Sequence, residues 1–123
     1  GSSRNFYLVT CSDKNEGDYD AIAYYADGPQ EKPEDWPDKV AQVSKPPGTW
    51  EGHNREANIY DDSWFTAKIS SGAEHLKKGE IAGTGDFEGE AFVCFKRDGE
   101  TLYSASDVIC REKYWCPSVD VSE

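Results

Sequence analysis

Glu51, His53 and Arg55 alternate along the chain and are the first residues whose types and spacing could do chemistry. On a strand their side chains would share one face. With His75 supplied from elsewhere, they would provide a carboxylate, two imidazoles and a guanidinium, the groups needed for acid–base cleavage of RNA. One group takes the 2′-hydroxyl proton, a second protonates the leaving oxygen, and the guanidinium stabilises the phosphate charge. The competing interpretation is an ordinary solvated strand face.

Asp86, Glu88 and Glu90 form a second alternating set, with Phe87 on the opposite face of the same expected strand. Paired carboxylates hydrolyse glycosides when one is held protonated near another that stays ionised. Exposed tryptophans would then stack against sugar rings, and the candidates are Trp36, Trp50, Trp64 and Trp115. The sequence therefore allows a carbohydrate-active hydrolase or a sugar-binding protein. The alternative is a solvated acidic stripe with the tryptophans in the core.

The remaining acidic and sulfur side chains do not form a metal motif. Candidate calcium ligands are Glu16, Asp18 and Asp20, or Asp61 and Asp62, but none lies in a twelve-residue loop with a central glycine and a terminal glutamate. Cys110 and Cys116 have five residues between them, more than the usual spacing of paired zinc ligands. We expect no metal and no cofactor.

The four cysteines, Cys11, Cys94, Cys110 and Cys116, predict two disulfides in a small secreted domain. Four cysteines allow three pairings. We favour Cys11 with Cys116 and Cys94 with Cys110, because a long-range link ties separate strands together. A bridge from Cys11 to the C-terminal cysteines would close a loop of about 80 to 105 residues and remove roughly 4 to 5 kcal/mol of denatured-state entropy.

Charge and length limit the classes of partner. Lys and Arg total 13 against 24 Asp and Glu in 123 residues, a net charge of −11, which repels nucleic-acid phosphate and anionic lipid. No apolar run is long enough for a membrane span or a signal-peptide core. We expect residues 1–3 to be a tag-cleavage scar, a signal peptide to have been removed, and residues 4–123 to form one secreted domain.

Short segments rich in β-branched and aromatic residues predict an all-β fold, a small antiparallel barrel or sandwich. The expected strands are residues 6–11, 19–25, 40–43, 64–70, 81–87, 91–96, 101–103 and 108–110. The Asp98-Gly99 pair predicts a hairpin between residues 91–97 and 101–104. One short helix is expected over residues 72–78, ended by Gly79.

Residues 28–52 hold most of the prolines together with Trp36 and Trp50, and predict a long loop, apart from the short strand expected at 40–43. One interpretation is a surface loop whose tryptophans fold back over the open end of a barrel. The other is a binding lip. The acidic part, residues 31–38, has no role that the sequence indicates.

Several segments in order along the chain resemble a group of small secreted proteins from filamentous fungi. They are residues 6–12 (FYLVTCS), 23–25 (AYY) with Gly28 and Pro29, 50–52 (WEG), 92–96 (FVCFK) with Asp98 and Gly99, and 114–117 (YWCP). The resemblance implies a disulfide-stabilised β-barrel-like domain released around plant cells, where some members act as elicitors of plant defence or as effectors. It carries over no catalytic residue.

The predicted function is therefore a non-catalytic, secreted elicitor or effector that binds a plant cell-surface receptor or a cell-wall polysaccharide. Trp36, Trp50 and Tyr60 are the expected binding anchors, because aromatic residues dominate binding hot spots. Exposed sheet edges would also permit a homodimer. The alternative from another class is a small polysaccharide hydrolase that uses Glu88 or Glu90 with Asp86.

Overall fold

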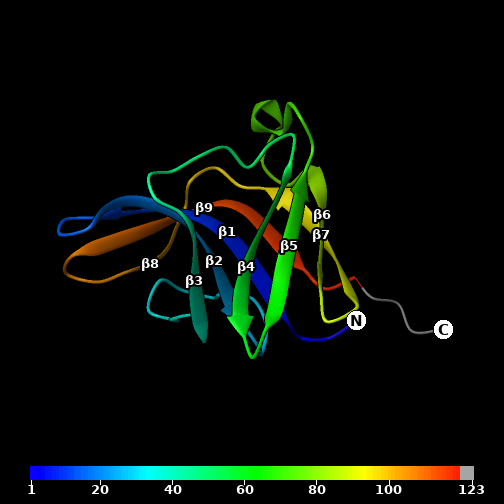
Figure 1. Ribbon diagram of the computed structural model, residues 1–123, viewed down its shortest axis with the longest axis horizontal. Coiled ribbons are helices and arrows are strands. Elements are labelled where there is room, and N and C mark those ends of the chain that lie inside the picture. The colour runs from blue at the N-terminus through cyan, green and yellow to red at the C-terminus, as the bar shows by residue number, and fades with distance from the viewer. Residues whose placement is uncertain (120–123) are drawn as a thin grey trace.

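The computed structural model describes residues 1–119 and has only strands and one short 3-10 turn (Figure 1). The strands are β1 (Asn5–Asp13), β2 (Gly17–Tyr25), β3 (Lys39–Ser44), β4 (Asn54–Tyr60), β5 (Ser63–Ile69), β6 (Ile81–Phe87), β7 (Glu90–Lys96), β8 (Thr101–Ser104) and β9 (Val108–Pro117). The all-β prediction is confirmed. No helix in residues 1–119 has the length and apolar character needed to cross a membrane.

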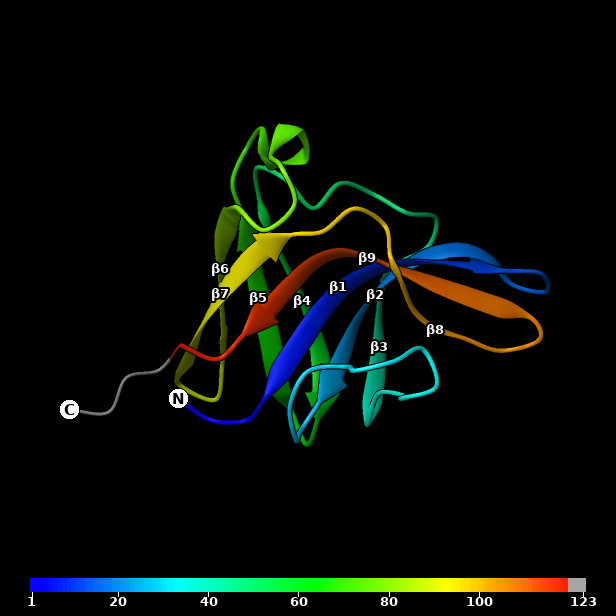
Figure 2. The same ribbon diagram turned by 180° about the vertical axis from the view of Figure 1, so that it is seen from behind.

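The strands form one antiparallel sheet that curls into a nearly closed barrel. Their order is β3-β2-β1-β9-β7-β6-β5-β4, and β8 pairs with the first half of β9 outside this path. The two end strands, β3 and β4, lie side by side without a ladder of hydrogen bonds between them (Figure 1). Figure 2 shows β1, β9 and β7 crossing the opposite wall together.

Arg55 links the two end strands across this gap. From β4 its guanidinium donates to Asp20 Oδ2 on β2 at 2.8 Å and to Ser44 Oγ on β3. Asp20 is fully buried and also accepts from Thr10 Oγ1 at 2.6 Å. The guanidinium lies over the ring of Trp50, 4.3 Å from its centroid. A buried ion pair with further hydrogen bonds to Thr10 and Ser44 thus connects strands that do not share a ladder.

Two of the predicted elements are wrong. Residues 91–97 and 101–104 do not form a hairpin, because β7 pairs with β6 and β9 while β8 pairs with β9. The Asp98-Gly99 turn instead runs beside β9, where Gly99 N donates to the carbonyl of Glu112. The helix expected at 72–78 is only the 3-10 turn Ala73–His75, flanked by Gly72 and Gly79 in left-handed conformations with φ of 86° and 92°.

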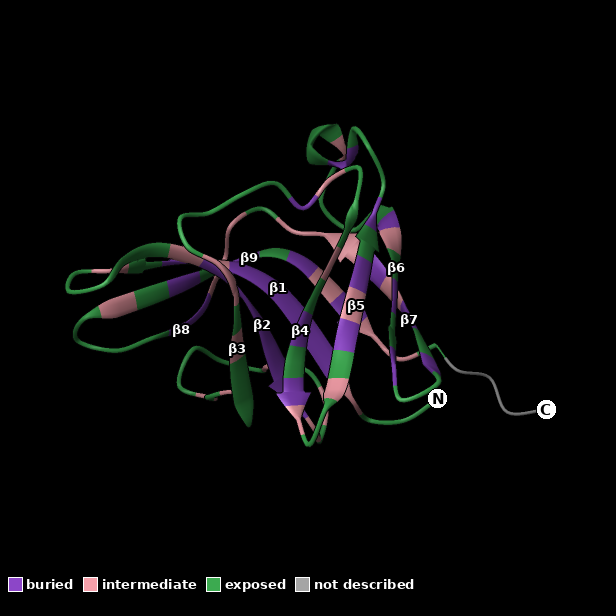
Figure 3. Cartoon of the chain, in the orientation of Figure 1, coloured by how far each residue is buried: buried purple, intermediate pink, exposed green. Residues whose placement is uncertain are grey.

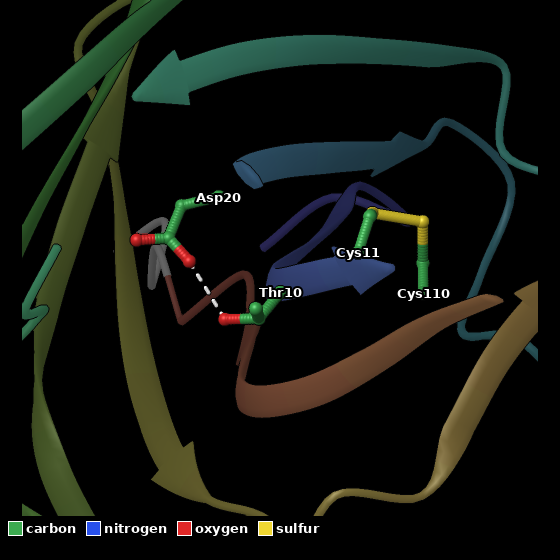
Figure 4. The surroundings of a disulfide bond; sticks show 4 residues. All are labelled: Thr10, Cys11, Asp20 and Cys110. Atoms are coloured by element: carbon green, nitrogen blue, oxygen red, sulfur yellow. Dashed lines mark hydrogen bonds between the residues drawn. A yellow bond between two sulfur atoms is a disulfide. The ribbon is translucent and has the colours of Figure 1, made fainter. Parts of the chain in front are cut away.

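The predicted disulfide pairing is also wrong. The bridges are Cys11–Cys110 and Cys94–Cys116. Cys11 and Cys110 face each other in the β1–β9 register, whereas Cys116 lies opposite Phe6, five residues further along β1. That offset is roughly 17 Å at the rise of a β-strand, too far for a disulfide. Figure 4 shows the Cys11–Cys110 bridge beside the Thr10–Asp20 hydrogen bond.

The buried residues form two clusters, on the two faces of the wall made by β1, β2 and β9. Figure 3 shows that β1 is buried over most of its length. The inner cluster fills the barrel with aromatic rings, including Phe6, Phe65, Phe87, Phe92 and Tyr114. The outer cluster covers the outside of the same wall and contains Tyr7, Val9, Cys11, Ala21, Ala23, Tyr25, Leu102, Tyr103 and Cys110. Each cluster contains one disulfide, Cys94–Cys116 inside and Cys11–Cys110 outside.

Candidate functional site

The residues considered for RNA cleavage do not converge. The carboxylate of Glu51 accepts from the Tyr114 hydroxyl, and His53 Nε2 lies 2.8 Å from the Thr49 carbonyl. Arg55 points inward to Asp20. His75 is on the 3-10 turn and its side chain is exposed to solvent. Two imidazoles and a guanidinium that face different surroundings cannot act on one phosphate.

The acidic set of Asp86, Glu88 and Glu90 is not a strand face. Glu88 and Gly89 form the two-residue turn between β6 and β7, with φ of 52° and 79°. Asp86 is exposed on β6, whereas Glu90 is buried on β7. Arg4 lies between the two glutamates, 2.9 Å from Glu88 and 3.3 Å from Glu90. The turn therefore leaves Glu88 and Glu90 on one arginine and separates them from Asp86, so the three carboxylates do not form one strand face.

The surroundings of Glu90 stabilise its ionised form. Burial raises the pKa of this carboxyl group, but hydrogen bonds from Ser118, Ser2 and Arg4 outweigh it and leave the pKa below its usual value. A general acid for glycoside hydrolysis needs a raised pKa. The hydrogen bonds instead tie the N-terminal segment to the β6–β7 hairpin.

The three predicted anchors lie in different surroundings. Trp50 is only 3% exposed and belongs to the inner cluster, so its prediction as a surface anchor is wrong. Tyr60 is half-buried against Tyr24 and Phe87, with ring centroids 5.9 Å and 5.7 Å away. Trp36 is 55% exposed. Of the three, Trp36 alone presents a large apolar surface to solvent.

The loop that carries Trp36, residues 26–38, is fixed to the outside of the barrel. The Tyr25 hydroxyl donates to the Asp35 carbonyl at 2.7 Å, and Gln30 Nε2 donates to the Leu102 carbonyl at 2.8 Å. The ring of Trp36 packs against Tyr103 with centroids 5.1 Å apart. The loop therefore covers the outer cluster and does not fold over the open end of the barrel.

A row of large apolar side chains crosses the outer wall from β6 to β1. Ile81 pairs with Phe95, Phe95 pairs with Trp115, and Trp115 pairs with Tyr7. The Trp115 ring lies 5.8 Å from Phe95 and 6.4 Å from Tyr7, and stacks nearly parallel to Tyr7. Ile81 is 67% exposed, Phe95 and Trp115 are half-buried, and Tyr7 is buried. We call these four residues the outer row.

A pocket of about 170 Å³ opens beside the buried end of the outer row. It is lined by Tyr7, Pro29, Gln30, Arg97, Glu112 and Trp115. Glu112 is only 2% exposed and accepts from Arg97 Nε at 2.8 Å. Burial raises its pKa, and the Arg97 charge offsets that rise in part. Burial also raises the pKa of Tyr7 to about 12, so its hydroxyl stays protonated. We call this cavity the Glu112 pocket.

A β-bulge brings Glu112 and Trp115 to the same face. Strict alternation along β9 would place residues 112 and 115 on opposite sides. Val9 pairs with Glu112 and Leu8 with Tyr114, so Lys113 is the extra residue on β9. After the bulge, Tyr114 points into the barrel and Trp115 points outward. Sequence reasoning missed this site because charged residues 111–113 looked like the end of the strand.

A second hollow, of about 350 Å³, lies at the 26–38 loop. Its lining includes Asp27, Glu31, Asp35 and Asp38 together with Tyr25. Two of its carboxylates accept from neighbouring backbone, Asp38 from Ala26 N at 2.7 Å and Asp35 from Glu31 N at 3.2 Å. Residues 1–119 hold no group of three or more His, Cys, Asp or Glu side chains arranged for a metal ion.

Comparison with known proteins gives no relative: no family model, no curated protein and no solved structure matches this chain.

Proposed function

We propose that this protein is a secreted, non-catalytic binding protein that acts as an elicitor of plant defence or as an effector. Its partner would be a plant cell-surface receptor or a cell-wall polysaccharide. Two disulfides support the extracellular part of the proposal, because such bonds persist in oxidising environments.

The observation that carries the proposal is the exposed Trp36 on a fixed loop. Exposure of a tryptophan gives up the stabilisation that its burial would provide. Hydrogen bonds from Tyr25 and Gln30 hold the loop, so Trp36 is presented in one place and little ordering entropy is lost when a partner binds. Tryptophan on a preorganised surface is typical of a binding hot spot.

The arrangement of the acidic residues favours binding over hydrolysis. A hydrolase using Glu88 or Glu90 with Asp86 would need one carboxyl group with a raised pKa. Both glutamates instead share Arg4, and the pKa of Glu90 is lowered. A homodimer stays a prediction, and light scattering after size-exclusion chromatography would test it.

Leaf infiltration tests the proposed function. We expect the oxidised protein to trigger an oxidative burst and the reduced, alkylated protein to fail, because the surface depends on the disulfide-held fold. The Trp36→Ala variant should lose most of the response while its circular dichroism and unfolding midpoint stay unchanged. Trp64→Ala is the matched control, because Trp64 is 46% exposed on β5 without a loop that holds it. Equal responses to both variants would refute the role of Trp36.

A further inference from the structure

We infer that the Glu112 pocket and the outer row bind a neutral saccharide, with one sugar ring in the pocket and the chain continuing over Trp115 and Phe95. This site is separate from Trp36 and does not depend on the elicitor proposal.

The first support is the combination of polar groups in the pocket. Glu112 uses Oε1 to accept from Arg97, and within residues 1–119 no hydrogen bond reaches its other oxygen. The Tyr7 hydroxyl accepts from Gln30 N at 3.0 Å and donates to no acceptor in that part of the chain. The second carboxylate oxygen and the hydroxyl proton have no protein partner in that part of the chain, and both residues line the pocket, so these groups are available to a ligand. Neighbouring hydroxyls of a sugar ring can donate to the first and accept from the second.

The aromatic wall supplies the second support. Trp115 is held in orientation by its Nε1, which donates to Asn5 Oδ1 at 2.8 Å. Its ring and that of Phe95 are half-buried and sit next to each other across β9 and β7. Flat, fixed aromatic rings offer an apolar surface at little cost in side-chain entropy. The C–H face of a pyranose ring can lie on such a surface while its hydroxyls reach Glu112 and Tyr7.

Charge and size select the class of saccharide. Glu112 and Arg97 neutralise each other in the pocket, and the chain carries a net charge of −11, so an acidic polysaccharide is repelled. A cation finds no unbalanced carboxylate there. The volume of about 170 Å³ is below the usual range for drug-sized ligands and fits one ring. A neutral glycan that ends or bends at the pocket satisfies all three limits.

The β-bulge at Lys113 places the two main side chains of this site on the same face of β9. Without it, Glu112 and Trp115 would face opposite sides of β9. Bulges often re-aim side chains beside functional sites. The Asp98-Gly99 turn follows the bulge, with Arg97 N donating to the Lys113 carbonyl, and it delivers the Arg97 side chain to Glu112. The bulge, the Asp98-Gly99 turn and the Arg97–Glu112 ion pair therefore meet at one pocket.

Titration of the ¹⁵N-labelled, oxidised protein tests the inference. The probes are cellohexaose, xylohexaose, laminarihexaose and chitohexaose, with polygalacturonate as the acidic comparison. We expect at least one neutral probe to shift the Trp115 indole N–H resonance in a saturable way, and polygalacturonate to leave it unchanged. The buried Trp50 indole serves as an internal reference.

Variants separate the pocket from nonspecific stacking. Glu112→Gln keeps the side-chain shape and should raise the Kd about tenfold or more, as loss of a buried charged hydrogen bond does. Trp115→Ala should abolish the shift of the remaining pocket amides, and Trp64→Ala should bind like the wild type. The wild-type map and Glu112→Gln decide the matter even where Trp115→Ala fails to fold. No saturable shift with any neutral probe, or shifts confined to the Trp36 or Trp64 indole, would overturn the inference.

Discussion

The two faces of the β1–β2–β9 wall both carry aromatic side chains, but they differ in how far these side chains are buried. Inside the barrel, Phe6 touches Phe65, Phe87 and Phe92 with ring centroids 4.0 to 5.1 Å apart, and all four rings are buried. Outside, the aromatic row runs from buried Tyr7 to half-buried Phe95 beside an open pocket. The inner cluster is thus packed for stability, whereas both of the binding surfaces that we propose lie on the outer wall.

Removal of either disulfide should have the largest effect on the free energy of unfolding, and one disulfide lies on each face of the wall. The outer bridge, Cys11–Cys110, spans 99 residues and the inner bridge, Cys94–Cys116, spans 22. Loop-closure entropy predicts a loss of about 4.7 kcal/mol for the Cys11→Ala/Cys110→Ala pair and about 3.4 kcal/mol for Cys94→Ala/Cys116→Ala. Urea unfolding measures both. A larger loss for the inner pair would show that packing around each bridge, and not loop length, controls its contribution.

Breaking the buried ion pair inside the barrel comes next. Arg55→Ala leaves the fully buried Asp20 carboxylate without its cation and should cost about 3 to 5 kcal/mol. Lys45→Ala is the control, because its pair with Glu16 is solvent-exposed and should be worth about 0 to 1 kcal/mol. Chemical denaturation compares the two. Similar losses would mean that Arg55 does not hold the β3–β4 gap closed.

Overfilling the inner cluster tests how tightly it is packed. A Cβ at residue 85 would lie 2.4 Å from the Phe65 ring, so Gly85→Ala should cost about 1 to 3 kcal/mol. At Gly48 the nearest atom would be an ordinary 3.5 Å away, on Arg55, and Gly48→Ala should stay within about 0.5 kcal/mol of the wild type. Thermal unfolding distinguishes them. If Gly85→Ala leaves the unfolding temperature unchanged, the Phe65 ring can move to make room and the interior is not tightly packed there.

Two buried carboxylates should give pH dependences of opposite sign. The pKa of Glu90 is lowered, so its stabilisation is complete above the unfolded-state pKa of about 4.3 and is lost as the pH falls through the lower folded value. Burial raises the pKa of Glu112, the charge of Glu100 adds to the rise, and the charges of Arg97 and Lys78 offset it in part. Stability therefore falls as the pH rises from about 4.3 through the raised folded value.

Glutamine variants isolate each contribution. The stability of the wild type relative to Glu90→Gln should increase as the pH rises toward about 4.3, and relative to Glu112→Gln it should decrease as the pH rises above about 4.3. Denaturant titrations at several pH values give the two slopes. Slopes of the same sign would contradict the assignment of distinct surroundings to Glu90 and Glu112.

The sequence predicted the fold class and most strands to within a few residues, because β-branched and aromatic runs bounded by turns carry that information. It missed β4, whose inward residues are Arg55, Ala57 and Ile59, so that only two of the three are apolar. It ended β9 at Cys110, because the next three residues are all charged. Glu112 among them is nevertheless buried, and it accepts a hydrogen bond from Arg97.

The site was harder to predict than the fold. Trp50 was predicted as a surface anchor because it is an aromatic residue within the loop expected at residues 28–52, yet it is buried and the Arg55 guanidinium lies over its ring. The disulfide pairing follows from strand register, which spacing in sequence does not reveal. Pocket residues from β1, the 26–38 loop, the Asp98-Gly99 turn and β9 meet only after the sheet is assembled, and the Lys113 bulge changes which of them face outward.

The most direct test of the division between interior and outer wall compares the defence response with stability for two variants. Gly85→Ala should unfold at a lower denaturant concentration but trigger the oxidative burst at the wild-type dose, since it leaves the outer wall intact. Trp36→Ala should keep the wild-type stability and require a higher dose or fail altogether. Responses that follow stability across the wild type and both variants would contradict the account.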